Sequence, residues 1–250
     1  MRSRLLSLAC SALLLVTGCE KTPPPFAKVD GQWRYRDTPI PGADAGSFEV
    51  VSEHYAKDRR QVFWADTHRD SREYFTVAHP QVSVVEGADP ATFRLLARDI
   101  AKDAHAVYDE GKRRAIRDVA SFELLDYGFA RDRTAGYCWL TEIPGSDGPT
   151  FAVVDSHHAK DRHRAYYCDL DTDGGTRPAY AKIVPLADGR VASFRALEHE
   201  YAVDDRAVYF RGEVLAGADL ASFTALSYTE NGADARDARH RYASGKRLDP

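Results

Sequence analysis

The chain has 250 residues, 44% of them apolar, and a formal net charge of -4. This length and apolar fraction are enough for a sizeable hydrophobic core in one domain or one repeat array. The mild acidity argues against a nucleic-acid-binding protein, because such proteins carry a basic face.

The N-terminus is typical of a secretory signal peptide. Arg2 and Arg4 supply positive charge, and residues 5–16 form an apolar segment of signal-peptide length. The run Val16-Thr17-Gly18-Cys19 that ends it resembles a bacterial lipobox. This resemblance implies a signal peptide of residues 1–18, cleavage before Cys19 and diacylation of Cys19, with palmitate as the expected lipid. The alternative is an ordinary secretory signal that contains a cysteine by chance.

Residues 19–27 are predicted to be a lipid-anchored, proline-rich tether, because three successive prolines favour an extended spacer. Glu20 is not the aspartate that retains lipoproteins at the inner membrane under the enteric sorting rule. We therefore expect an envelope protein of the outer membrane, on its periplasmic or its surface face. No other stretch of the sequence reaches the roughly 18 apolar residues that a membrane-spanning helix needs.

Residues 28–250 repeat one pattern with a basic unit of 29 residues. Each copy contains a marker aspartate, which we expect to open a tight turn with its carboxylate. An aromatic residue stands five positions later, in the second of two short strands. The pairs are Asp30 and Tyr35, Asp58 and Phe63, Asp103 and Tyr108, Asp132 and Tyr137, Asp161 and Tyr166, Asp204 and Tyr209, and Asp237 and Tyr242.

A second landmark of the repeat is Ser or Thr followed by Phe, in most copies three residues after a turn aspartate. The turn aspartates are Asp44, Asp89, Asp118, Asp147 and Asp219. An aspartate there predicts a short, capped helical turn. The fold expected is therefore mainly β: tandem hairpin or meander units of two or three antiparallel strands, each preceded by such a turn. One meander cannot bury its own apolar face, so we expect the units to stack into one elongated array.

The repeated run Tyr-Ala-Lys-Asp followed by Val and aromatic residues, clearest at residues 55–64 and 201–210, resembles the DKNYW repeat family of bacterial envelope proteins. The resemblance covers about residues 26–250. It implies a β-repeat fold and an envelope location, and brings no catalytic motif. The lysine before the marker aspartate is replaced by Val203, Arg131 and Arg236 in three copies. We take this position to be a solvated strand edge.

Two insertions, near residues 66–81 and 169–184, lengthen the repeat, and function in repeat arrays tends to lie on insertions. The second begins with Asp169, Asp171 and Asp173, followed by Gly174. Alternating carboxylates before a glycine are suited to a calcium loop, although Tyr180 stands where an EF-hand would have Glu. The alternative, which we favour, is an acid-rich hairpin loop without a metal.

The densest group of imidazoles comprises His157, His158 and His163, with Asp161 among them. Zinc would need three or four converging ligands, whereas neighbouring residues of a strand face opposite sides. A solvent-facing strand edge is therefore the preferred interpretation.

Cys138 and Cys168 are expected to form a disulfide, because two cysteines remain after the signal and the lipid site in an oxidising compartment. They lie six and seven residues after their marker aspartates. This offset of one would place them on opposite faces unless a bulge corrects it.

No sequence motif of a hydrolase, kinase or metalloprotease is present. The repeated aromatic residues suit a buried core, or a carbohydrate-binding platform if they are exposed. The leading hypothesis is a non-enzymatic, membrane-anchored lipoprotein that binds an envelope protein or glycan and no nucleic acid. The alternatives are a calcium-stabilised binding module and an envelope hydrolase with acids on the two insertions.

Overall fold

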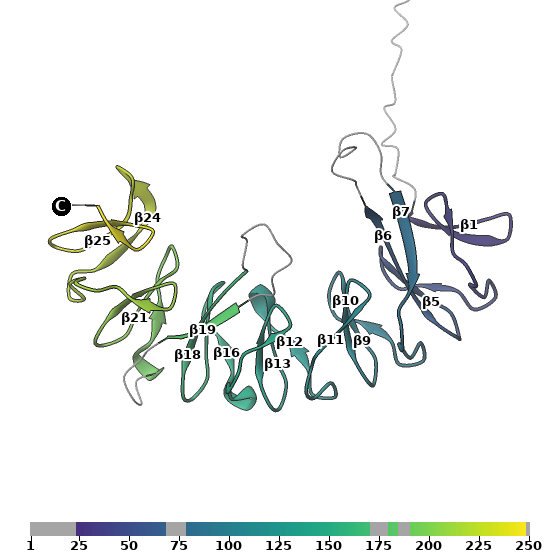
Figure 1. Ribbon diagram of the computed structural model, residues 1–250, viewed down its shortest axis with the longest axis horizontal. Coiled ribbons are helices and arrows are strands. Elements are labelled where there is room, and N and C mark those ends of the chain that lie inside the picture. Colours follow the sequence, from purple (N-terminus) through teal and green to yellow (C-terminus); the bar gives the residue numbers. More distant parts are fainter. Residues whose placement is uncertain (1–23, 69–78, 171–179, 185–190, 249–250) are drawn as a thin grey trace, which may run out of the picture.

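The computed structural model describes residues 24–68, 79–170, 180–184 and 191–248. Within these ranges the chain forms seven small antiparallel sheets, which follow one another in chain order in a row (Figure 1). The first sheet has three strands and each of the others has four, connected as a meander. The expectation of two or three strands was wrong for six sheets, because the residues directly after each Ser/Thr-Phe pair form a strand of their own.

The strands are short, and most of the first strands in the four-stranded sheets have only two residues. The first sheet contains β1 (Phe26–Val29), β2 (Gln32–Tyr35) and β3 (Thr38–Pro39). The second contains β4 (Glu49–Val50), β5 (Tyr55–Lys57), β6 (Val62–His68) and β7 (His79–Val84). The third contains β8 (Arg94–Leu95), β9 (Ile100–Lys102), β10 (Val107–Asp109) and β11 (Lys112–Arg114). The fourth contains β12 (Glu123–Leu124), β13 (Phe129–Arg131), β14 (Gly136–Cys138) and β15 (Thr141–Glu142).

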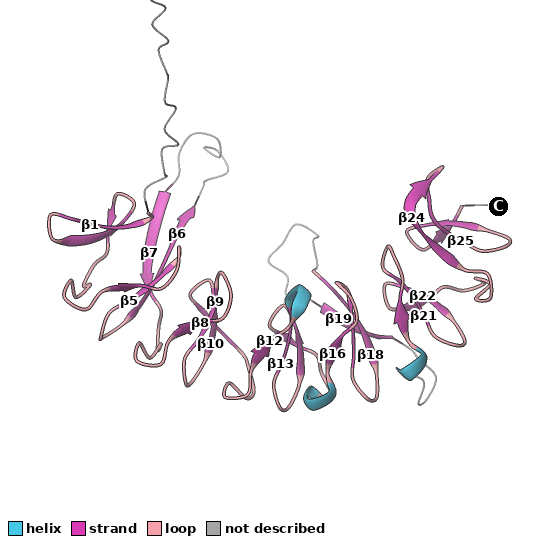
Figure 2. Cartoon of the chain, turned by 180° about the vertical axis from the view of Figure 1, so that it is seen from behind, coloured by secondary structure: helices cyan, strands magenta, loops and turns pink. Residues whose placement is uncertain are grey.

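The fifth sheet contains β16 (Ala152–Val153), β17 (His158–Lys160), β18 (Ala165–Asp169) and β19 (Tyr180–Val184). The sixth contains β20 (Arg195–Ala196), β21 (Tyr201–Val203), β22 (Val208–Phe210) and β23 (Glu213–Val214). The seventh contains β24 (Thr224–Glu230), β25 (Ala233–Arg236), β26 (Arg241–Ala243) and β27 (Lys246–Arg247). Three short 3-10 turns, cyan in Figure 2, are η1 (Asp126–Gly128), η2 (Gly148–Thr150) and η3 (Val191–Ser193).

The predicted capped helical turns are mostly absent from the described repeats. At Asp44, for example, the Ser47 N–H donates to the Asp44 carbonyl at 3.1 Å, which closes a four-residue β-turn. Only residues 148–150 and 191–193 make a 3-10 turn at this position of the repeat. Even there, the Asp147 side chain makes no capping hydrogen bond to the turn. The turn aspartates instead accept from the N–H two residues later, as at Asp44, Asp89 and Asp219, and from the Ser or Thr hydroxyl three residues later, as at Asp118.

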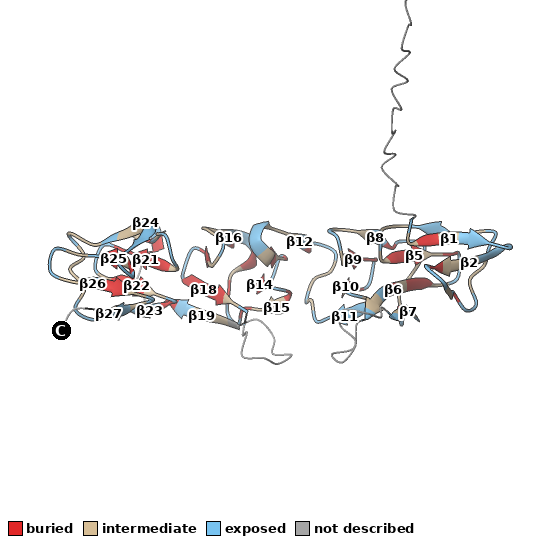
Figure 3. Cartoon of the chain, turned by 90° about the horizontal axis from the view of Figure 1, so that it is seen from above, coloured by how far each residue is buried: buried red, intermediate tan, exposed pale blue. Residues whose placement is uncertain are grey.

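The core is divided among the junctions between neighbouring sheets. Each junction contains one phenylalanine of the Ser/Thr-Phe pairs, which we call the junction phenylalanine. It packs on the ring five residues after the marker aspartate of its own sheet. The ring centroids are 5.6–6.5 Å apart in Phe48–Phe63, Phe93–Tyr108, Phe122–Tyr137, Phe151–Tyr166, Phe194–Tyr209 and Phe223–Tyr242. Most of the buried strand residues lie on the inner strands of the sheets (Figure 3).

Consecutive residues of the third strand serve two different junctions. Tyr166 packs in the core between the fourth and fifth sheets, whereas Tyr167 packs in the core between the fifth and sixth. Tyr209 and Phe210 divide in the same way one sheet later. Alternation along a strand therefore directs the fifth residue after the marker aspartate to the preceding sheet and the sixth to the following sheet.

Candidate functional site

The marker aspartates are saturated with hydrogen bonds. Asp132 accepts through Oδ1 from the N–H groups of Thr134 at 2.6 Å and Ala135 at 2.9 Å. Its Oδ2 accepts from the N–H of turn aspartate Asp118 at 2.9 Å and from the Tyr137 hydroxyl at 2.5 Å. Burial alone would raise the pKa of Asp132, but the hydrogen bonds from Tyr137, Thr134 and Asp118 outweigh it and lower the pKa to about 2.

The same arrangement, which we call the carboxylate relay, recurs along the chain. The tyrosine five residues later donates to its marker aspartate in the pairs Tyr108–Asp103, Tyr166–Asp161, Tyr209–Asp204 and Tyr242–Asp237. Burial raises the pKa of these hydroxyls, to about 12 for Tyr242. Asp58 forms the relay without a hydroxyl partner, because Phe63 occupies the tyrosine position. These carboxylates and hydroxyls are occupied in holding turns.

Asp30 does not belong to this set, which corrects the sequence prediction. It is exposed and has a φ of 51°, and it forms a two-residue hairpin turn with Gly31 between β1 and β2. A two-residue turn of this type needs positive φ at both positions, which Asp and Gly tolerate. The other marker aspartates close turns of four residues, in which the carboxylate has two free N–H groups to bind.

The sequence suggested that the lysine before the marker aspartate lies on a solvated strand edge. This prediction was wrong. The Lys102 side chain is buried, and its Nζ donates to the carbonyls of Val119 at 2.8 Å and Phe122 at 3.2 Å in the next repeat. Lys57 makes equivalent bonds to Pro90 and Phe93. Lysine and arginine can both make this bond, so their exchange in the sequence does not indicate exposure. This side chain ties one sheet to the next.

The predicted calcium loop lies largely outside the described residues, which end at Leu170 and resume at Tyr180. Asp171 and Asp173 are therefore not described. Asp169 accepts from the Leu170 N–H at 2.8 Å and from the Tyr167 hydroxyl at 3.1 Å. No group of three or more His, Cys, Asp or Glu side chains within the described ranges could hold a metal ion.

The histidines have different environments, and the strand-edge interpretation is wrong for His158. Its side chain is fully buried, 5.7 Å from the junction phenylalanine Phe194, at a position where other repeats have Phe26, Tyr55 or Phe129. Its Nδ1 lies 3.0 Å from Asp155 Oδ1. His157 instead stacks on Tyr167 at the surface, and His163 is exposed. Asp161 is buried in its own relay, so these groups do not converge.

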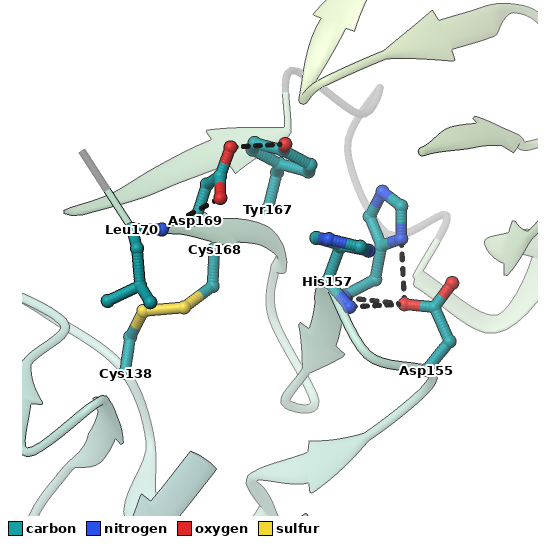
Figure 4. Close-up of a disulfide and its surroundings, with 8 residues drawn as sticks. Cys138, Asp155, His157, Tyr167, Cys168, Asp169 and Leu170 are labelled. Carbon is teal, nitrogen blue, oxygen red and sulfur yellow. Dashed lines mark hydrogen bonds and ion pairs between the residues drawn. A yellow bond between two sulfur atoms is a disulfide. The ribbon is translucent and has the colours of Figure 1, made fainter. Parts of the chain in front are cut away.

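Cys138 and Cys168 form the predicted disulfide, with their Cα atoms 6.2 Å apart (Figure 4). The offset of one residue needs no bulge to correct it. Cys138 stands six residues after Asp132 and faces the following sheet, whereas Cys168 stands seven after Asp161 and faces the preceding one. Both side chains therefore point into the junction between the fourth and fifth sheets, where they join the same core.

A groove lies at the junction between the third and fourth sheets. We call it the Trp139 groove. It has a volume of about 730 Å³, and its lining includes Trp139, Leu170, Leu125, Ile100 and Asp109. The Trp139 ring is about half exposed, at 49%, and Leu170 is 42% exposed. The groove combines an aromatic and aliphatic wall with six charged side chains, and its size is that of a ligand site.

The groove forms where residues at two positions differ from those in the other repeats. At three other junctions a glycine in the turn after the third strand lies on a ring of the preceding sheet: Gly111 on Trp64, Gly212 on Tyr167 and Gly245 on Phe210. At this junction the ring position is occupied by Asp109 and the glycine position by Leu140. The missing ring leaves space at this junction, where the Trp139 ring lies on Gly128 of its own sheet and is about half exposed.

This turn is strained, because both central residues have positive φ and neither is glycine. Trp139 has a φ of 47° and Leu140 of 61°. A non-glycine residue in this region costs about 1–2 kcal/mol. Cys138 directly precedes Trp139, and Cys168 lies two residues before Leu170, so the disulfide fixes both sides of the groove. The positive φ of Trp139 recurs at the same turn position in Glu110, Arg211 and Ser244, so Leu140 is the residue that departs from the repeat.

A second hollow of about 730 Å³ is lined mainly by residues of the fifth and sixth sheets. Its lining includes Tyr127, Ser156, His157, His199 and Glu200. The two hollows share one loop, since Gly128 lines the Trp139 groove and its neighbour Tyr127, which is 61% exposed, lines the second. Sequence reasoning missed both Trp139 and Tyr127. The signal available was the absence of glycine from a turn that has glycine in other copies.

The predicted hydrolase would need acids of the two insertions to converge. The described acids at their bases are Asp66 in β6 and Asp169 in β18, which belong to the second and fifth sheets. Residues 69–78 and 171–179 lie outside the described ranges. Among the helices that the structure describes, none is long and apolar enough to cross a membrane.

Comparison with known proteins identifies a family. The model of the DKNYY family matches residues 26–170 and 117–246, two overlapping matches of the kind expected from a repeat. No curated protein and no solved structure matches the chain. The resemblance to DKNYW-type repeats is thereby confirmed over nearly all the described residues, and the chain belongs to the DKNYY family.

Proposed function

We propose that the protein is a lipoprotein, anchored to the outer membrane through Cys19, whose repeats bind an envelope protein or glycan without catalysing a reaction. The seven sheets stack into one elongated array, and residues 19–25, ahead of β1, hold it away from the membrane. The lipobox-like run before Cys19 supports the anchor. The Trp139 groove supports the binding role.

The Trp139 groove is the observation that carries this proposal. Tryptophans at the centre of protein surfaces with neighbouring apolar side chains often dominate binding energies. Here the ring lies on Gly128 beside a disulfide and stays about half exposed, whereas at three other junctions a glycine of the turn packs on a ring of the preceding sheet. The repeated aspartates and tyrosines, by contrast, are committed to the carboxylate relays.

Two measurements test the proposal. Palmitate labelling and membrane fractionation in an expressing bacterium should show a labelled, outer-membrane protein, and Cys19→Ser should be unlabelled and soluble in the periplasm. For binding, solubilised envelope is passed over the immobilised lipoprotein. Trp139→Asn should reduce retention at least about tenfold, whereas the matched variant Tyr228→Asn should not, because Tyr228 is an exposed aromatic of the seventh sheet.

Asparagine is chosen for both variants because it tolerates the positive φ of Trp139, so the turn is preserved. Equal retention by the wild type and Trp139→Asn would show that the groove is not the binding site. A palmitate label on Cys19→Ser would remove the anchor.

A further inference from the structure

We infer that the Trp139 groove binds an uncharged oligosaccharide chain, with the Trp139 ring as its stacking platform. This inference rests on the proposed binding function and names its ligand class.

The charge of the groove favours an uncharged ligand with many hydroxyl groups. Arg98, Lys112 and Arg114 supply three positive charges to its lining, and Asp99, Asp109 and Glu110 supply three negative ones. Arg114 forms an ion pair with Asp109, and Asp99 lies 2.6 Å from His54 Nδ1. An anion or a cation would therefore meet like charge on one side of the groove. A sugar hydroxyl both donates and accepts, so it can bind carboxylates and guanidinium groups together.

The apolar part of the groove fits the other face of a sugar ring. A pyranose presents C–H groups on its flat sides and hydroxyls around its rim. The Trp139 ring lies on Gly128 and is about half exposed, so its exposed part offers an apolar surface for the C–H face, and Leu170 lines the same groove. The Trp139 N–H of the main chain donates to the Gly128 carbonyl at 2.8 Å, so the backbone under the ring is fixed before a ligand arrives.

The second hollow indicates a chain of sugars and not a single sugar. Its lining includes a second exposed ring, Tyr127, whose chain neighbour Gly128 lines the Trp139 groove, and polar residues such as Ser156 and Glu198. Two hollows of about 730 Å³, each with one exposed aromatic side chain, suit a ligand that continues from one to the other. A long ligand of this kind gains affinity from both sites.

The test uses isothermal titration of the full-length lipoprotein in detergent with two uncharged probes, cellohexaose and chitohexaose, up to about 10 mM. At least one should bind with a dissociation constant below about 1 mM. Trp139→Asn should weaken that binding at least about tenfold, and Trp139→Tyr should weaken it less, because a ring is retained. Tyr127→Asn should weaken binding of the hexasaccharide more than binding of the matching disaccharide. Tyr228→Asn should have no effect.

Three results would overturn the inference. The first is that neither oligosaccharide binds. The second is binding that is equal in the wild type and Trp139→Asn. The third is binding of an acidic or a basic heptapeptide, but of no oligosaccharide, in a manner that depends on Trp139. In this last case the proposed binding function survives and only the ligand class is wrong. Thermal melts of each variant confirm that a lost signal is not lost folding.

Discussion

The Tyr137 hydroxyl donates a hydrogen bond of 2.5 Å to Asp132 Oδ2, which also accepts the N–H of the turn aspartate that begins the repeat. One carboxylate thus connects the hairpin of the sheet, its third strand and the turn that leads into it. The second sheet can be compared with the others, because Phe63 stands at its tyrosine position and the relay there forms without a hydroxyl.

Tyr137→Phe should lower the free energy of unfolding by about 1–2 kcal/mol, because it removes a buried hydrogen bond to a charged acceptor and keeps the ring. Urea denaturation measures the change. The converse variant, Phe63→Tyr, restores the missing donor to Asp58 and should stabilise the protein or leave it unchanged. A cost for Tyr137→Phe below about 0.3 kcal/mol would show that the hydroxyl bond is unimportant.

Asp132→Asn should lower the free energy of unfolding by about 3 kcal/mol or more. The amide NH2 of Asn is a donor, and it would face N–H and O–H groups that are also donors. Asp30→Asn is the matched control, since Asp30 is exposed and outside the relays. It should change stability by less than about 0.5 kcal/mol. Equal effects of the two variants would contradict the distinction between the two kinds of turn.

Acid should unfold the protein through the relays. Hydrogen bonds outweigh burial and lower the pKa values of Asp58, Asp103, Asp132, Asp161 and Asp237 below the ordinary range. Their contribution to stability is complete above the unfolded-state pKa of about 3.9 and is lost as the pH falls through the folded-state values, about 2 for Asp132. Urea titrations at a series of pH values should show stability falling below about pH 4. A flat profile between about pH 4 and 2 would contradict this prediction.

The junction phenylalanines should each carry a large share of the stability. Phe151 is fully buried between the fourth and fifth sheets, so Phe151→Ala should cost about 3–5 kcal/mol. Gly136→Ala should also be destabilising, because its Cβ would lie 2.3 Å from the Phe151 ring. Tyr228→Ala, at a side chain that is 86% exposed, is the control and should be neutral. A calorimetric melt distinguishes these outcomes.

The disulfide should stabilise both the fold and the groove. The double variant Cys138→Ala/Cys168→Ala should lower the free energy of unfolding by about 2–4 kcal/mol, as expected for a closed loop of this length. Because Trp139 directly follows Cys138 and Leu170 lies two residues after Cys168, the emission of Trp139, measured with Trp33 and Trp64 replaced by Phe, should also shift to the red as the ring gains freedom. Stability and emission that match those of the wild type would show that the bond does not position the groove.

Much of the fold follows from residue types in the sequence. The marker aspartates, the aromatic residues five positions later and the Ser/Thr-Phe pairs predict a repeated β unit, and the structure confirms it with seven antiparallel sheets. The first strand of most four-stranded sheets could not be predicted, since two residues such as Arg94 and Leu95 carry no periodic signal. Whether the aromatics lie inside or outside also required the structure, because alternation along a strand is the same in both cases.

The candidate site was less predictable than the fold. The insertions were expected to carry function, but the groove arises where Asp109 and Leu140 replace a ring and a glycine within an ordinary repeat. The exchange affects two residues about thirty positions apart, which meet only through sheet stacking. Lys102 was misinterpreted for the same reason: its carbonyl partners lie 17–20 residues along the chain, in the next unit.

The central claim, that the array binds its partner through the Trp139 groove, is tested most directly by photo-crosslinking in living cells. Benzoyl-phenylalanine is placed at Leu170 beside the groove and, separately, at Val29, Val214 and Tyr228, which are exposed on other sheets. We expect a discrete adduct from Leu170 that disappears when Trp139→Asn is added, and no adduct from the other three positions. Adducts of equal yield at Val29 or Tyr228, unchanged by Trp139→Asn, would contradict it.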